Sequence, residues 1–353
     1  MHVLTRASSV RWVVRVTGNF TSERPLHPAV KEALLAAFDQ GWADPKKISQ
    51  SASRAAILKN QSIENIASKL DLRPDAIEVI GEPALGHYFS ICGLLRAGDH
   101  FAYSTTDKGK IRAIARSHPG NVQELTVGAD GLFSTAEKLQ SGTVLSLQLA
   151  NGETGVIQKS AHLGASHIAV DATVSGPRLP LPEVWSTAVF DAQSWGGPAG
   201  LGILAINSAS YSYPLPHIAP IKSPGSYSLP LLIAAAIALE NFTPEDSAIR
   251  RNLISSLSDL DGVSVVAPSV AALPHKLSLS VTGIAGEHLV RSLAERGIDV
   301  DSGSACSPAD LQPSHVLAAM GYPTSGHIRV TLHSGTTPEE IVALRQALIQ
   351  LLR

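Results

Sequence analysis

Short apolar runs that alternate with helical patterns constrain the fold of this chain most. The runs lie at residues 77–80, 144–149, 168–170, 187–190 and 202–206. They are apolar almost throughout, which is typical of strands that are covered on both faces. Between several of them, apolar residues recur at helical spacing. The sequence therefore predicts an α/β fold with a mostly parallel sheet flanked by helices.

The C-terminal part of the chain has a different pattern. Residues 263–267, 276–281 and 328–332 alternate as half-buried antiparallel strands do, and a helix is expected between them from Gly286 to Gly297. Thr337, Pro338 and Glu340 form a capping-box pattern that opens a last helix. We expect a large α/β domain at residues 17–240, and a smaller α+β domain made of residues 1–16, with a strand at 10–16, and residues 241–353.

Composition excludes several classes of function. A net charge of −2 over 353 residues provides no basic face for nucleic acid and no polybasic patch for a membrane. No apolar run reaches the length of a membrane span. The two cysteines form neither a disulfide framework nor a metal-ligand spacing, so no metal site and a cytoplasmic location are expected.

Polar clusters follow three of the predicted strands. They lie at residues 151–155, 171–173 and 191–200, and they include Asn151, Asp171 and Ser194. In an open α/β sheet, ligands bind at the carboxyl ends of the strands. The order of these clusters therefore predicts a ligand site at one edge of the sheet.

The loop around Cys306 is the second candidate site. Small residues flank the cysteine on both sides, and a helix is expected from Pro313 to Gly321. A thiolate beside a helix N-terminus is favoured by the helix dipole. From these residues alone, a buried inert thiol and an accessible nucleophile both stay open.

Several motifs together resemble one family. They are Asn-Gly-Glu-Thr-Gly at 151–155, Val-Asp-Ala-Thr at 170–173, Gly-Gly-Pro-Ala-Gly-Leu-Gly at 196–202 and Ser-Gly-Ser-Ala-Cys-Ser at 302–307, which is followed by Pro-Ser-His-Val at 313–316. Their order is similar to that of the cysteine desulfurases, in the class V aminotransferase family of fold-type I pyridoxal-phosphate enzymes. The resemblance covers nearly the whole chain, and it implies a fold-type I transferase fold and a homodimer.

The resemblance also implies roles for single residues. Asp171 matches the carboxylate that pairs with the pyridinium nitrogen, and Ser226 matches a residue that reaches the phosphate across the dimer. Arg329 matches the arginine that binds the substrate carboxylate, and Asn151 lies beside a position that contacts ring or substrate. Cys306 matches the nucleophile that holds sulfur as a persulfide.

Other positions depart from the family pattern. The lysine that forms the Schiff base is replaced by Ser194, and its neighbour is Gln193. Lys108 stands where a ring should stack on the cofactor, and Pro83 stands in the turn that should cradle its phosphate. Val174 replaces the partner of the ring hydroxyl. A serine hydroxyl forms no imine, so we expect no covalently held pyridoxal phosphate.

These observations favour a cysteine desulfurase-like protein that lacks the standard cofactor chemistry. Cys306 would act as a sulfur-accepting thiol beside an active desulfurase or another sulfur-transfer partner. One alternative is an active enzyme that uses Lys108 or Lys222 to form the imine. Another is a binding or scaffold protein without catalysis.

Overall fold

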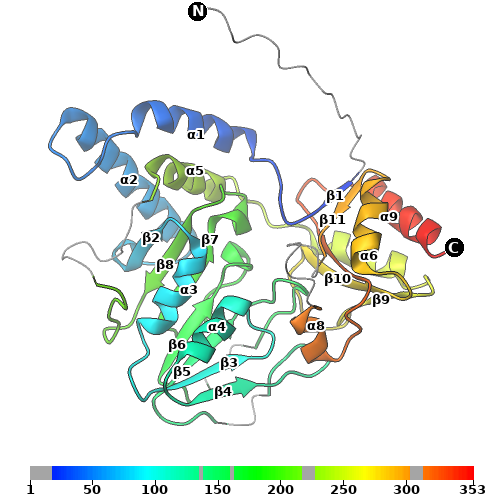
Figure 1. The fold of residues 1–353 in the computed structure, drawn as a ribbon. Coiled ribbons are helices and arrows are strands. Elements are labelled where there is room, and N and C mark those ends of the chain that lie inside the picture. The colour runs from blue at the N-terminus through cyan, green and yellow to red at the C-terminus, as the bar shows by residue number, and fades with distance from the viewer. Residues whose placement is uncertain (1–17, 135–137, 160–162, 217–226, 303–312) are drawn as a thin grey trace, which may run out of the picture.

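The computed structural model describes residues 18–134, 138–159, 163–216, 227–302 and 313–353. The strand expected at residues 10–16 lies outside the described residues. Within them, the chain forms a large sheet, a small antiparallel sheet and a short strand pair (Figure 1).

The large sheet has seven strands in the order β2-β8-β7-β6-β5-β3-β4. All neighbours pair in parallel except β8, which is antiparallel to both β2 and β7. The strands are β2 (Ile77–Ile80), β3 (His100–Ser104), β4 (Val122–Leu125), β5 (Thr143–Gln148), β6 (His167–Asp171), β7 (Thr187–Asp191) and β8 (Gly202–Ile206). The prediction of a mostly parallel sheet is therefore confirmed.

Helices cover both faces of the large sheet, which explains its apolar strands. Leu145 and Phe190 face a core that is shared with α2 (Gln50–Lys69) and α5 (Leu229–Glu240), and α1 (Pro28–Gln40) packs on α5. The neighbouring residues Val144 and Val189 face α3 (Pro83–Cys92) and α4 (Gly109–Ser117) on the other side (Figure 1). Successive residues of a strand point to opposite faces, so a strand that is covered twice must be apolar at every position.

The small sheet is antiparallel, with the order β12-β10-β9. Its strands are β9 (Val263–Val265), β10 (Lys276–Val281) and β12 (His327–Thr331). Alternate residues of β10 and β12, such as Leu277, Leu279 and Val330, are buried in a second core. Helices α6 (Ser247–Leu257), α7 (Gly286–Ala294) and α9 (Pro338–Leu351) complete this core, and the capping box predicted at Thr337 opens α9.

Three strands and one helix start were not predicted. Gly18 and Asn19 are residue types that predict a loop, but β1 (Gly18–Phe20) pairs there in parallel with β11 (Ile298–Val300), and Phe20 lies in the second core. A three-residue strand is too short to show a period, and β4 is a mostly exposed edge strand. The sequence pattern predicts a helix near residues 88–95, whereas α3 begins at Pro83. The division into two domains stays a prediction.

The carboxyl ends of the parallel strands lie along one edge of the large sheet. This edge carries residues 105–108 after β3, residues 149–155 after β5 and residues 172–175 after β6. The short helical turns η2 (Gly176–Arg178) and η3 (Ala192–Trp195) follow β6 and β7, η1 (Pro74–Ala76) precedes β2, and α8 (His315–Met320) lies beside the small sheet. In the described part of the chain, no helix is long and apolar enough to cross a membrane.

The central strand β5 generates a prediction about stability. Leu145 is 0% exposed, so Leu145→Ala should lower the free energy of unfolding by about 2–5 kcal/mol, because it removes buried contacts and leaves a cavity. Val184 is 54% exposed, and Val184→Ala should change it by no more than about 0.5 kcal/mol. Urea unfolding followed by circular dichroism checks both values, and equal effects would contradict this account of the core.

Candidate functional site

A cavity of about 240 Å³ lies between the edge of the large sheet and the small sheet. Its walls combine side chains from both parts of the chain. The large sheet contributes Thr173, Val174, Asp191, Gln193 and Ser194, and the small sheet contributes Lys276, Thr331, Leu332 and His333. Val174 and Ser194, two positions at which the resemblance implies other residues, therefore line one cavity.

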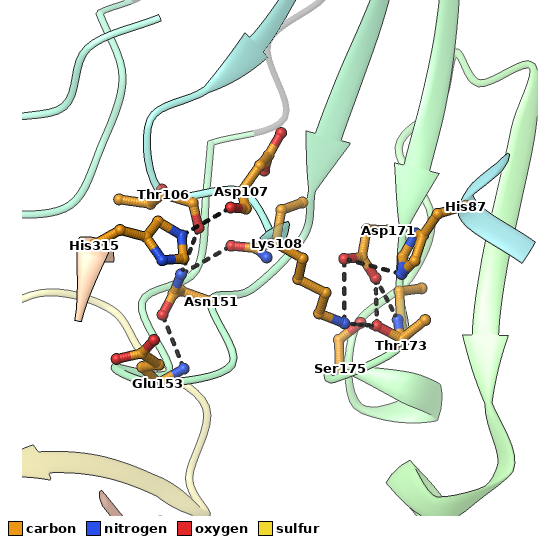
Figure 2. A network of polar contacts seen from close by, with 12 residues as sticks. His87, Thr106, Asp107, Lys108, Asn151, Glu153, Asp171, Thr173, Ser175 and His315 are labelled. Atoms are coloured by element: carbon orange, nitrogen blue, oxygen red, sulfur yellow. Dashed lines mark hydrogen bonds and ion pairs between the residues drawn. The ribbon is translucent and has the colours of Figure 1, made fainter. Parts of the chain in front are cut away.

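The last residue of β6, Asp171, is buried beside this cavity and binds a lysine. Its Oδ2 lies 3.3 Å from Nζ of Lys108 and 4.0 Å from Nε2 of His87. Its Oδ1 accepts hydrogen bonds from the backbone N–H of Thr173, at 2.9 Å, and from the Thr173 hydroxyl. Figure 2 shows Lys108 reaching across from the end of β3 to Asp171 and to the Thr173 hydroxyl.

Lys108 supplies the positive charge that Asp171 needs. Burial by itself would raise the pKa of Asp171, but Lys108, His87 and the hydrogen bonds from Thr173 outweigh it and hold that pKa below its usual range. Burial also lowers the pKa of His87, although Asp171 opposes this. The imidazole is therefore neutral near pH 7, and the ammonium of Lys108 balances the carboxylate.

Ser194 lies in η3, and its hydroxyl is used within the fold. The hydroxyl donates to the backbone carbonyl of Asp191 at 2.7 Å. Gly176 adopts a φ of 52°, and a Cβ there would come within 2.4 Å of the Ser194 oxygen. Arg178 donates to the backbone carbonyl of Ser194. Residue 194 is therefore packed against η2, while the neighbouring Gln193 is exposed.

The N-terminus of α3 carries a carboxylate from its own chain. Glu82 is the N-cap residue, and its Oε1 accepts from the backbone N–H of Ala84 at 2.9 Å. Pro83, at the first helical position, has no N–H to offer. Because helix N-termini favour anions, Glu82 takes a place in which an external anion would otherwise bind.

Asn151 holds the turn after β5 together. Its amide nitrogen donates to the carbonyl of Thr106 at 3.1 Å and to Gln148 at 3.0 Å. Its amide oxygen accepts from the backbone N–H groups of Glu153 and Thr154 (Figure 2). The Asn151 amide therefore makes its hydrogen bonds to other parts of the same chain. A role of Asn151 in binding substrate stays a prediction.

The remaining predicted site residues are only partly placed. Arg329 lies on β12, and its Nη2 donates to the backbone carbonyl of Ser302 at 3.3 Å. In the sequence, Ser302 lies four residues before Cys306. Cys306, Ser226 and Lys222 lie outside the described residues. Their roles and that of Arg329 in binding substrate stay predictions.

Sequence reasoning missed three charged groups near the cavity. Arg178 forms a buried ion pair with Glu245 through two hydrogen bonds, at 2.6 and 2.7 Å, and its guanidinium lies over Phe242. Arg24 and Lys276 also line the cavity. The alternation Lys-Leu-Ser-Leu-Ser-Val of β10 did contain a signal, because it places Lys276 on the polar face of the strand. Among the described residues, no cluster of His, Cys, Asp or Glu could hold a metal ion.

The ion pair of Lys108 with Asp171 generates a prediction about stability. Lys108→Met should lower the free energy of unfolding by about 2–3 kcal/mol, because it leaves a buried carboxylate without its cation. This is less than a fully buried pair would lose, since the Lys108 side chain is 30% exposed. The exposed neighbour Lys110 provides the control, and urea midpoints give the measurement. Equal midpoints for Lys108→Met and Lys110→Met would refute the role of the ion pair.

The sequence of this chain is similar to those of known proteins. A profile of the family described as aminotransferase class-V matches residues 221–344. The cysteine desulfurase IscS of Dictyoglomus turgidum is 26% identical over 365 residues, which cover 92% of this chain and 91% of that protein. The cysteine desulfurase IscS of Pseudomonas putida is 30% identical over 253 residues, which cover 62% of this chain and 61% of that protein.

Solved structures share the fold. A NifS-like protein superposes with a TM-score of 0.84 at 21% identity, over 95% of this chain and 99% of that chain. The cysteine desulfurase CsdA of Escherichia coli superposes with a TM-score of 0.78 at 18% identity, over 95% of each chain. At these identities the structures show the fold alone, and they confirm the fold-type I architecture. The profile match and the sequence relatives support a chain that is similar to the cysteine desulfurases and to the class V aminotransferases.

Proposed function

We propose that this chain is a cysteine desulfurase-like protein that does not carry out the pyridoxal-phosphate chemistry of its family, and that it accepts sulfur on Cys306. The observation that carries the first part is the position of Lys108, whose ammonium lies 3.3 Å from the carboxylate of Asp171. The resemblance assigns that carboxylate to the pyridinium nitrogen of the cofactor.

The charge at Asp171 argues against a bound pyridinium ring. A protonated ring nitrogen would have to displace an ammonium that already balances a buried carboxylate. The displaced ammonium would then lie close to a second positive charge, in surroundings where such repulsion is strong. The chain thus provides its own cation where the family uses the one on the cofactor.

The charge at α3 argues in the same direction. The resemblance assigns the turn before this helix to the cofactor phosphate, and here the carboxylate of Glu82 caps the helix. A phosphate would meet a like charge at the helix end that should attract it. Together with the alcohol at Ser194, these contacts do not fit pyridoxal phosphate, and we derive no step through it.

These contacts also bear on the alternative of an active enzyme with a relocated lysine. Imine formation needs an amine that is free to attack a carbonyl, whereas Nζ of Lys108 contacts Asp171 and the Thr173 hydroxyl. Lys222, the other lysine in that alternative, lies outside the described residues. We therefore favour the loss of the cofactor chemistry over its relocation.

The proposed role of Cys306 is to accept the outer sulfur of a persulfide. The Cys306 thiolate attacks that sulfur, an S–S bond forms at Cys306, and the bond to the donor breaks. The donor leaves as a thiolate, so the step needs no external oxidant. An active desulfurase would supply the persulfide, and the protein would act as a homodimer in the cytoplasm, where thiols stay reduced.

The other cysteine supports this assignment by contrast. Cys92 is partly buried in α3, and burial raises the pKa of its thiol to about 11. Since the thiolate is the nucleophile, Cys92 is almost unreactive at neutral pH.

Binding of pyridoxal phosphate tests the first part of the proposal. Added pyridoxal phosphate should give no saturable imine absorbance that depends on Asp171. The reason is that Lys108 already forms an ion pair with the Asp171 carboxylate. Absorbance titration of the wild type and of Asp171→Asn, followed by borohydride reduction and peptide mapping, provides the measurement. An imine trapped on Lys108 or Lys222, or one that Asp171→Asn abolishes, would contradict the proposal.

Labelling with a persulfide donor tests the second part. The wild type and Cys92→Ala should each take up one labile sulfur at Cys306, whereas Cys306→Ala should take up almost none, since the Cys92 thiol is mostly protonated. Mass spectrometry of alkylated peptides reads the label. Equal uptake by Cys306→Ala and the wild type would exclude the carrier role.

A further inference from the structure

The small sheet forms one wall of the cavity, and this wall carries Lys276, a lysine with no role so far. Lys276 is the first residue of β10, and it pairs with Thr331 of β12. Ser278 pairs with Arg329 in the same register. Because Leu277 and Leu279 point into the core, Lys276 points to the opposite face of the sheet, and it lines the cavity together with Thr331.

Packing fixes the stem of this lysine. Gly155, in the turn after β5, has a φ of 75°, and a Cβ there would come within 2.7 Å of the Lys276 Cβ. Arg250 donates to the backbone carbonyl of Lys276 at 3.0 Å. The amine donates to the Thr331 hydroxyl at 2.9 Å, and it makes no ion pair with any carboxylate in the described part of the chain. The side chain is therefore held in place without a fixed counter-ion.

The surroundings of Lys276 favour its neutral form. Burial lowers the pKa of Lys276 to about 8, and the positive charges of Arg329 and Arg178 add to this effect. Asp301 and Glu245 oppose it, but Glu245 is paired with Arg178. His275 and His333 also face the group, and burial lowers the pKa of each. About half of the Lys276 amine is then neutral at pH 8, whereas an exposed lysine is almost fully charged.

A second cation lines the same cavity, and the acid that acts on its charge, Glu245, is already paired with Arg178. Arg24 lies in the loop after β1, and a Cβ on Gly196 would come within 2.4 Å of its Nη2. It makes no ion pair with a carboxylate that the structure describes. A guanidinium binds carboxylates through paired hydrogen bonds, so the cavity combines an amine nucleophile with an open site for a carboxylate.

We propose that Lys276 binds a small carbonyl compound that carries a carboxylate, such as a 2-oxo acid, as an imine, and that Arg24 receives the carboxylate. The neutral amine attacks the carbonyl carbon, and a C–N bond forms. The two protons of the amine pass to the carbonyl oxygen, the C–O bond breaks, and the oxygen leaves as water. Amine and carbonyl thus give imine and water without an oxidant. This site uses neither Cys306 nor Asp171, and it does not rest on the sulfur-accepting role.

Reductive trapping tests the proposal. Full-length protein is incubated with glyoxylate and cyanoborohydride at pH 8, and peptide mapping locates the adduct. Lys276 should react about tenfold faster than the exposed Lys47, and its rate should rise with pH around a midpoint near 8. Lys276→Arg keeps the charge but forms no imine, so its adduct should disappear, whereas Lys47→Arg should react as the wild type does.

Two further comparisons separate the parts of the proposal. Arg24→Gln should raise the half-saturating concentration of glyoxylate about tenfold but leave trapping by the uncharged aldehyde propanal unchanged. Equal loss with both reagents would overturn the role of Arg24. In the wild type, adducts spread evenly over exposed lysines would overturn the role of Lys276, even if a Lys276 variant failed to fold. Cys306→Ala should react as the wild type does, so this site and the sulfur carrier can fail separately.

Discussion

The buried carboxylate of Asp171 needs a positive charge, and the arrangement of the candidate site depends on how that need is met. The residue ends β6 in the middle of a sheet whose strands are covered on both faces, so water cannot balance its charge. Lys108 reaches it from the end of β3, and the Thr173 hydroxyl accepts a hydrogen bond from Lys108 and donates one to Asp171. A second internal charge, Glu82 on α3, lies along the same sheet edge. The chain's own side chains therefore supply the charges along this edge.

The small sheet gives the cavity a different character from the large one. The second core buries one face of β10 and β12, and the other face is polar. That face brings Lys276 and Arg329 towards the edge of the large sheet, where Arg178 already pairs with Glu245. In the described part of the cavity, Arg178 is paired with Glu245, whereas Lys276 forms no ion pair.

Much of the fold could be predicted because local patterns agreed with the tertiary structure. The apolar runs of β5, β6 and β7 require helices on both faces, and those helices are present. Thr337 and Glu340 fold into the predicted capping box because its partners are three residues apart. The strands β1 and β11 escaped prediction because each has three residues and is stabilised by a partner far away in the sequence. No local pattern records such a partner.

By itself, the sequence determined which groups are chemically present: a cysteine among small residues, an alcohol at position 194, and Lys108 and Pro83 at positions where the resemblance implies other residues. Only the tertiary structure decided what these groups contact. It placed the Lys108 ammonium on Asp171, packed Ser194 against Gly176, and aligned Lys276 with Thr331 beside the cavity. The physical reason is that charge balance and burial depend on neighbours from distant segments, such as β3 with β6 and β10 with β12, whereas the sequence fixes only the nearest neighbours along the chain.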